Sequence, residues 1–188
     1  MKRLVLLCVA TLMSLAALAQ PDIDGKWSYT QTDNQKIGEK HEGDAQIKVT
    51  VNYTFDGSYF ECSMKAVLTM SFDQKGNDGK AEKAEFVVII TASTTGSSAF
   101  DGDLLTLTPD KKKPRVDVDA TINGAPAGSM ISGMVAAPVK KTLVAELKQI
   151  QKYKIVSVTD SKLTLQSVLT EKEKVKGVKE EIITLSKR

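Results

Sequence analysis

Cysteine and histidine are scarce in this sequence, which has two cysteines and one histidine among 188 residues. Cys8 belongs to the apolar N-terminal segment, so a chain that loses this segment keeps only Cys62. A single cysteine forms no internal disulfide, and a usual zinc site needs three or four His, Cys or carboxylate ligands. The sequence therefore predicts no disulfide, no metal and no cofactor.

Long apolar runs and an excess of one charge are also missing after the N-terminal segment. No apolar run beyond residue 19 approaches the ~20 residues that a membrane-spanning helix requires. Without Lys2 and Arg3 the chain has 24 basic and 23 acidic side chains, a net charge of about +1. Nucleic-acid binding needs a basic face, so nucleic acid is not an expected partner. The three lysines at 111–113 precede Pro114 and are expected to form a solvated turn.

The first 19 residues have the features of a secretory signal peptide. Lys2 and Arg3 form a basic start, residues 4–18 are uncharged and mostly apolar, and 17–19 (Ala-Leu-Ala) is a small-x-small cleavage site. We expect cleavage after Ala19, export to the periplasm or the medium, and a single domain over residues 20–188. The alternative, a lipoprotein signal at Cys8, is disfavoured because the apolar run continues past this cysteine.

Alternating apolar and polar side chains dominate the rest of the chain. The segments 46–55, 60–72 and 115–122 each place their apolar residues at every second position. A period of two is typical of half-buried β-strands. Within 84–94, Phe86, Val88 and Ile90 lie opposite Val87 and Ile89, so the segment is apolar on both faces, which predicts a strand that is covered on both sides.

Asp-Gly pairs at 56–57, 78–79 and 101–102 separate these segments. Asp-Gly favours tight hairpin turns because glycine adopts positive φ at little cost. About nine short strands joined by hairpins predict an antiparallel barrel or sandwich, and a near-continuous meander favours the barrel.

One segment has helical instead of alternating spacing. Apolar residues spaced for one face of a helix, with Pro138 at the first helical position, predict an amphipathic helix over about 137–151. We expect its apolar stripe to pack over one mouth or one side of the barrel; the stripe consists of Val139, Leu143, Leu147 and Ile150. The preceding stretch 123–134 is rich in Gly, Ala, Ser and Met and is expected to be a mobile connection or a close-packed lid.

Three stretches of the chain carry a family resemblance. The start IDGKWSY, with Gly25 and Trp27, resembles the opening strand of the lipocalin or calycin superfamily. The stretches FDGDLLTLTPD (100–110) and YKIVSVTDSKLTLQS (153–167), followed by EIITLSKR at the end, resemble bacterial secreted lipocalin-like proteins.

The resemblance implies an all-β, mostly antiparallel up-and-down barrel of about eight or nine strands. It also implies that Trp27 packs across the closed end of this barrel, beneath Lys187 or Arg188. The chain departs from animal lipocalins in three ways: it has no disulfide, Thr159-Asp160 is followed by Ser161 where they have tyrosine, and the predicted helix precedes the last strands.

Each polar residue that is a candidate for catalysis is better explained as a solvated or structural residue. His41 lies in a polar stretch, which predicts a solvated loop. The segment Asp73–Lys80 matches a calcium loop poorly because its glycine is one position late. Asp117 and Asp119 share a strand face expected to see water, and Cys62 lies on an apolar face, where an inert thiol is expected. The sequence therefore predicts no catalytic residues and no enzyme.

The remaining candidate is the barrel interior, whose predicted lining carries no charge. It consists of Tyr53, Met64, Leu68, Phe86, Val88, Ile90, Val118, Leu163 and Leu165. An eight-stranded barrel is just wide enough for a solid core or a small cavity, so either outcome is open. A cavity would bind a small apolar molecule, and it would open under the polar segment 32–45, expected to be a mobile loop. The alternative is an interaction module that uses its outer face or loops on another envelope protein.

Overall fold

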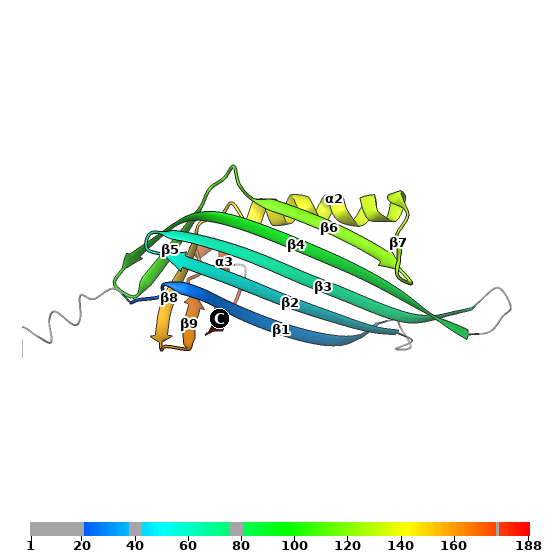
Figure 1. The fold of residues 1–188 in the computed structure, drawn as a ribbon, viewed down its shortest axis with the longest axis horizontal. Helices are drawn as coiled ribbons and strands as arrows, with labels where there is room; N and C mark the ends of the chain where they lie inside the picture. Colours follow the sequence, from blue (N-terminus) through cyan, green and yellow to red (C-terminus); the bar gives the residue numbers. More distant parts are fainter. Residues whose placement is uncertain (1–20, 38–42, 76–80, 176) are drawn as a thin grey trace, which may run out of the picture.

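The computed structural model describes residues 21–37, 43–75, 81–175 and 177–188 of the chain. It shows an all-β fold in which long strands curve past a group of shorter ones, with helices beside the sheet (Figure 1). The predicted signal peptide, residues 1–19, and His41 lie outside the described residues.

The strands fall into a long and a short group. The long ones form a continuous antiparallel meander: β1 (Gly25–Ile37), β2 (Gly43–Asp56), β3 (Tyr59–Lys75) and β4 (Ala81–Asp101). The shorter ones are β5 (Leu104–Pro109), β6 (Arg115–Ile122), β7 (Ala125–Pro126), β8 (Gln151–Val158), β9 (Lys162–Ser167) and β10 (Ile182–Lys187). The helices are α2 (Ser129–Glu146) and α3 (Glu171–Val175).

Eight of these strands close into an antiparallel barrel. The order β3-β2-β1-β10-β9-β8-β5-β4 becomes a ring because β3 also pairs with β4. This confirms the predicted antiparallel barrel. The sheet itself has ten strands, because β6 and β7 continue it from the part of β4 that β5 does not reach.

β4 changes its neighbour part of the way along its length. Phe86 to Ser93 pair with β6, whereas Gly96 to Asp101 pair with β5. β1 pairs with β10 at Trp27 and Ser28, so the described part of β1 beyond Ser28 pairs with β2 alone. The long strands thus leave the closed barrel and continue as an open curved sheet, here called the extension, which α2 flanks along β6 (Figure 1).

The closed end of the barrel holds the larger core. Its alternating strands turn apolar side chains inward from every side of the ring, and Leu105, Leu107, Leu163 and Leu185 are completely inaccessible to solvent. Two of the predicted Asp-Gly turns lie near this end, with φ of 55° at Gly57 and 61° at Gly102. Asp78-Gly79 lies outside the described residues.

The helix begins eight residues earlier than predicted and ends earlier. α2 spans Ser129–Glu146 with Pro138 inside it, and Ile150 is 59% exposed in the link to β8. Pro138, predicted at the first helical position, therefore lies in the helix interior, where it removes one backbone hydrogen bond. The stretch expected to be a mobile connection or a close-packed lid supplies β7 and the first turns of this helix.

Two further expectations were wrong. The segment 32–45 is not a loop at its ends, because Thr32 to Ile37 pair with Gly43 to Lys48 and polar cross-strand contacts such as Lys36–Asp44 support this hairpin. The strand 85–91 is not covered on both sides. Of its apolar residues only Val88 is fully buried, since the sheet extends here beyond the closed barrel.

Candidate ligand-binding site

Trp27 is buried in the larger core of the barrel, and Lys187 lies over it. The indole is 1% exposed, and its Nε1 donates a hydrogen bond to the Ile23 carbonyl oxygen at 2.7 Å. The Lys187 Nζ is 5.3 Å from the ring centroid, within range of a cation–π interaction. Of the two bases that the resemblance implies, Lys187 therefore contacts the ring, while the Arg188 guanidinium donates to the Asn52 side-chain oxygen at 3.0 Å.

Gly25 of the Gly-x-Trp pair is favoured at its position by its backbone conformation and by the nearby Lys187 side chain. Gly25 adopts a φ of 124°, and a Cβ added there would lie 3.1 Å from the Lys187 Cε. The aliphatic stem of Lys187 thus crosses over the Gly25 backbone on its way to the indole. A larger residue would be strained in both respects.

The nine predicted lining residues divide between two places. Tyr53, Leu163 and Leu165 are buried in the core of the closed end, packed with Trp27. Leu68, Phe86, Val88, Ile90 and Val118 form a second, smaller cluster in the extension, and the half-buried Met64 lies on β3 between the two. The extension, more than the closed barrel, therefore gathers the predicted lining.

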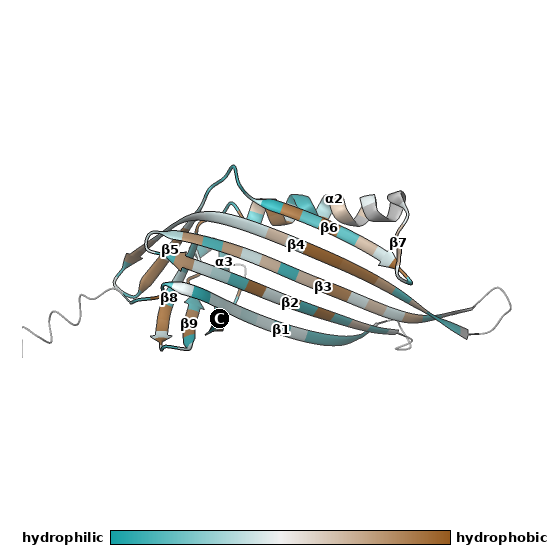
Figure 2. Ribbon diagram, in the orientation of Figure 1, coloured by the Kyte–Doolittle hydropathy of each residue, from teal (hydrophilic) through white to brown (hydrophobic). Residues whose placement is uncertain are grey.

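The inner face of the extension is a continuous apolar surface. Cross-strand register places Val51 beside Met64 and Ala92, then Val49 beside Ala66 and Ile90, then Ile47 beside Leu68 and Val88. This surface is the apolar inner face. It remains partly open to solvent, because Ile47 is 37% exposed and Phe72, further along the same side of β3, is 41% exposed. The long apolar stretch of β4 that contributes to it is brown in Figure 2.

A cleft opens beside the ends of β8 and β9, with a volume of about 660 Å³. Tyr153, from the inward side of β8, forms part of it, together with Ser167 and Leu169 and residues at the end of α2. We call this the mouth cleft. It contains the only Tyr hydroxyl among its described lining residues, and that hydroxyl donates to the Gln151 side-chain oxygen at 3.1 Å.

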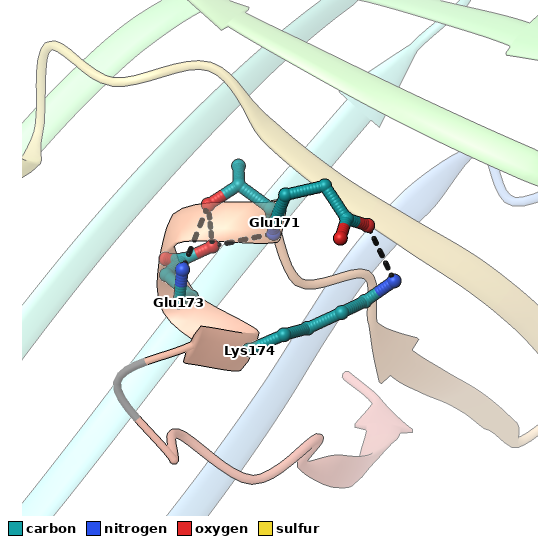
Figure 3. A network of polar contacts seen from close by, with 4 residues as sticks. Glu171, Glu173 and Lys174 are labelled. Carbon is teal, nitrogen blue, oxygen red and sulfur yellow. Dashed lines mark hydrogen bonds and ion pairs between the residues drawn. The ribbon is translucent and has the colours of Figure 1, made fainter.

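The short helix α3 forms one rim of the mouth cleft, and a capping box holds it. The Glu173 carboxylate accepts hydrogen bonds from the backbone N–H and the hydroxyl of Thr170, at 2.7 and 2.6 Å (Figure 3). Lys174 adds an ion pair to Glu171 at 2.9 Å. These are local contacts within one turn, and both Glu171 and Glu173 also belong to the lining of the mouth cleft.

Four polar side chains meet where the extension joins the closed barrel. Tyr53, Cys62 and Thr94 are consecutive cross-strand partners on β2, β3 and β4, in line with Trp27 on β1. Tyr153 reaches them from β8, and its hydroxyl interacts with that of Tyr53. These four residues are here called the polar row.

Burial keeps the polar row protonated. It raises the pKa of Tyr53 well above its usual value and also raises the pKa of Tyr153. The pKa of Cys62 rises to about 11, mainly because of burial, with a further contribution from Glu61. The thiol is therefore a weak nucleophile at neutral pH. The row can donate and accept hydrogen bonds but has no charge of its own.

Thr94 is the least satisfied member of the polar row. It is 3% exposed, and its Oγ1 has no hydrogen-bond partner among the described residues. Thr94 and Tyr153 are site residues that the alternation pattern does not single out by itself. A signal for Thr94 exists, since it continues the inward phase of Phe86, Val88 and Ile90 and is the first hydroxyl in that phase.

The other polar candidates do not assemble into a site. Asp117 and Asp119 are exposed on the outer side of β6, and Asp117 lies 3.8 Å from the Lys140 ammonium of α2. Most of the calcium-like stretch 73–80 lies outside the described residues. Within the described ranges, no three His, Cys, Asp or Glu side chains lie close enough to hold a metal ion.

The described helices are each too short or too polar to cross a membrane.

No protein-family model matches the chain, and no curated protein sequence is similar to it. The chain folds as an eight-stranded antiparallel barrel, which is compatible with a lipocalin-like one.

Proposed function

We propose that this protein is a non-catalytic, lipocalin-like binding protein that holds a small, largely apolar molecule against the apolar inner face. The observation that carries the proposal is the exposure of this face. Ile47 and Phe72 lie on the core side of their strands and are nevertheless more than one third exposed. A contiguous apolar surface left open to water is typical of a binding site.

The shape of the fold supports the same function. The closed end is filled by its own side chains, including Trp27, Leu163 and Leu165, so a ligand there would have to displace a packed core. Among the described strands, β4 pairs with β6 instead of β5 along the extension, and β1 beyond Ser28 pairs with β2 alone, so the ring is not closed there. A ligand on the apolar inner face would take the place of the missing half of the barrel.

The expected affinity from apolar burial alone is modest. Covering ~300 Å² of ligand apolar surface at ~25 cal/mol/Å² contributes about 7 to 8 kcal/mol. Association costs at least about 4 kcal/mol, which leaves a dissociation constant in the millimolar range. Tighter and selective binding therefore requires a hydrogen-bonding anchor.

A fluorescence titration with the neutral probe N-phenyl-1-naphthylamine tests the proposal. We expect saturable binding of one probe per chain and loss of this binding in Ile47→Lys, which places a charge on the apolar inner face. Val156→Lys is the matched control, because Val156 is equally apolar, 51% exposed and located on the outside of β8. Circular dichroism melts of both variants establish that they remain folded.

Two results would contradict the proposal. One is the absence of saturable binding to the wild-type chain; the other is an equal loss of binding in Ile47→Lys and Val156→Lys. Either result would favour the alternative function, an interaction module that binds another protein through the outer face of the sheet.

A further inference from the structure

The polar row lies next to the apolar inner face, where the extension joins the closed barrel. Tyr153 connects the row to the mouth cleft. Tyr53 and Cys62 are each one alternate position from Val51 and Met64 on the same faces of β2 and β3. Tyr153 belongs both to the polar row and to the lining of the mouth cleft. A molecule on the apolar inner face with its end directed toward the closed barrel would meet these hydroxyls first.

Thr94 indicates that hydrogen-bonding capacity remains in the polar row. A buried hydroxyl without a partner is unfavourable, and most buried polar groups in native proteins are satisfied. Thr94 points in the phase of the inner face, beside Cys62, at the junction where β4 exchanges β6 for β5. A ligand head group at this position would satisfy it.

The charges around the polar row select against an anionic head group. The lining of the mouth cleft, which Tyr153 shares with the polar row, has three carboxylates and one ammonium: Glu146, Glu171, Glu173 and Lys152. The row itself contains no Lys, Arg or His. A carboxylate or phosphate would be desolvated here without a compensating cation, whereas an uncharged donor or acceptor would not incur that cost.

We propose that the ligand is an uncharged amphiphile whose hydroxyl or carbonyl head is bound by Thr94 and Tyr153, while its hydrocarbon part lies along the apolar inner face. This inference rests on the proposed function and names its ligand class. The hydroxyls of Thr94 and Tyr153 anchor the head, and Tyr53 orients Tyr153 from behind.

Competition among three ligands with the same ten-carbon chain tests the head group. Decan-1-ol, decanoate and 1-chlorodecane are titrated against bound N-phenyl-1-naphthylamine on the full chain at pH 8. We expect decan-1-ol to displace the probe at about tenfold lower concentration than the other two, because it alone offers an uncharged hydrogen-bonding head.

Two substitutions test the named residues. Thr94→Val replaces the hydroxyl by a methyl group of similar volume, and Tyr153→Phe removes only the phenol oxygen. Each is expected to weaken decan-1-ol binding about tenfold while changing 1-chlorodecane binding by less than twofold. Thr95→Val is the matched control, because Thr95 is the next residue of β4 and lies in the opposite phase, on the outer face.

The outcomes separate this inference from the proposed function. If the probe and 1-chlorodecane bind but decan-1-ol has no advantage, or if decanoate binds best, the head-group inference is overturned and the binding function stands. Unchanged decan-1-ol binding in both Thr94→Val and Tyr153→Phe overturns the assignment of the anchor. If none of the compounds binds the wild-type chain, the inference and the proposed function fall together.

Discussion

The contact between Lys187 and Trp27 gives the most direct prediction about the stability of the barrel. Lys187→Met keeps most of the aliphatic stem over Gly25 and removes the ammonium that lies 5.3 Å from the indole centroid. Because Lys187 is exposed overall, the lost cation–π attraction is expected to cost about 0.5 to 1 kcal/mol of unfolding free energy. Lys187→Ala also removes the stem and is expected to cost about 1 to 2 kcal/mol, at about 0.8 kcal/mol for each buried methylene.

Urea unfolding followed by intrinsic fluorescence measures this cost, since Trp27 is the single tryptophan of the chain. With a slope of about 1 to 2 kcal/mol/M, the Lys187→Met midpoint should fall by about 0.3 to 1 M at unchanged slope. Lys162→Met is the control, because Lys162 is an exposed lysine of the neighbouring β9 with no ring contact among the described residues. Equal midpoints for the two methionine variants would refute the reasoning.

Four further predictions follow from burial and local geometry. Leu163→Ala should cost about 3 to 5 kcal/mol because Leu163 is fully buried, and Leu143→Ala about 1 kcal/mol because this face of α2 is only half-buried; equal losses in urea melts would be inconsistent with the packing. Gly96→Ala should cost about 3 kcal/mol or prevent folding, since its Cβ would clash with the Thr108 carbonyl oxygen, and a wild-type melting temperature would exclude this close approach. Cys62 should react with iodoacetamide at pH 8 at least a hundredfold more slowly in the folded than in the urea-unfolded chain, because burial raises its pKa to about 11; the folded rate should rise with pH toward that value, and equal rates at pH 8 would show that the thiol is accessible. Expression with the full N-terminus in a bacterial host should yield an exported protein whose mass corresponds to a start at Gln20, and retention of residues 1–19 in that fraction would contradict the predicted cleavage.

Much of the barrel could be predicted from the sequence because its physical signals are local. Alternation assigns the inward and outward faces of each strand without reference to any other strand, and Asp-Gly at 56–57 and 101–102 fixes two hairpins through the φ of glycine. The contact of Trp27 with a terminal base was implied by the resemblance, and the choice of Lys187 over Arg188 follows from strand phase: Lys187 is in phase with the inward Leu185, and Arg188 is not.

The polar hairpin at 32–45 and the helix show where local signals fail. Polar residues considered alone predict a loop. Pairing with β2 nevertheless satisfies the backbone hydrogen-bonding groups of β1 up to Ile37, whatever the polarity of the side chains. The start of α2 depends on an apolar spacing that continues through residues rich in glycine and serine, which by themselves indicate a connection.

The sequence alone predicted most of the alternating strand faces and two of the hairpin turns, because each depends on residues close together in the chain. Only the tertiary structure decided where the barrel is closed and where it is open. That division follows from β4, whose 21 residues pair with β5 at one end and β6 at the other, so that the ring closes over only part of its length. The pairing of β3 with β2 and β4 brings Thr94 to Cys62 and Tyr53, and the return of β8 adds Tyr153 from 59 positions further along the chain. No local pattern encodes that meeting, since it depends on the register and curvature of the whole ring.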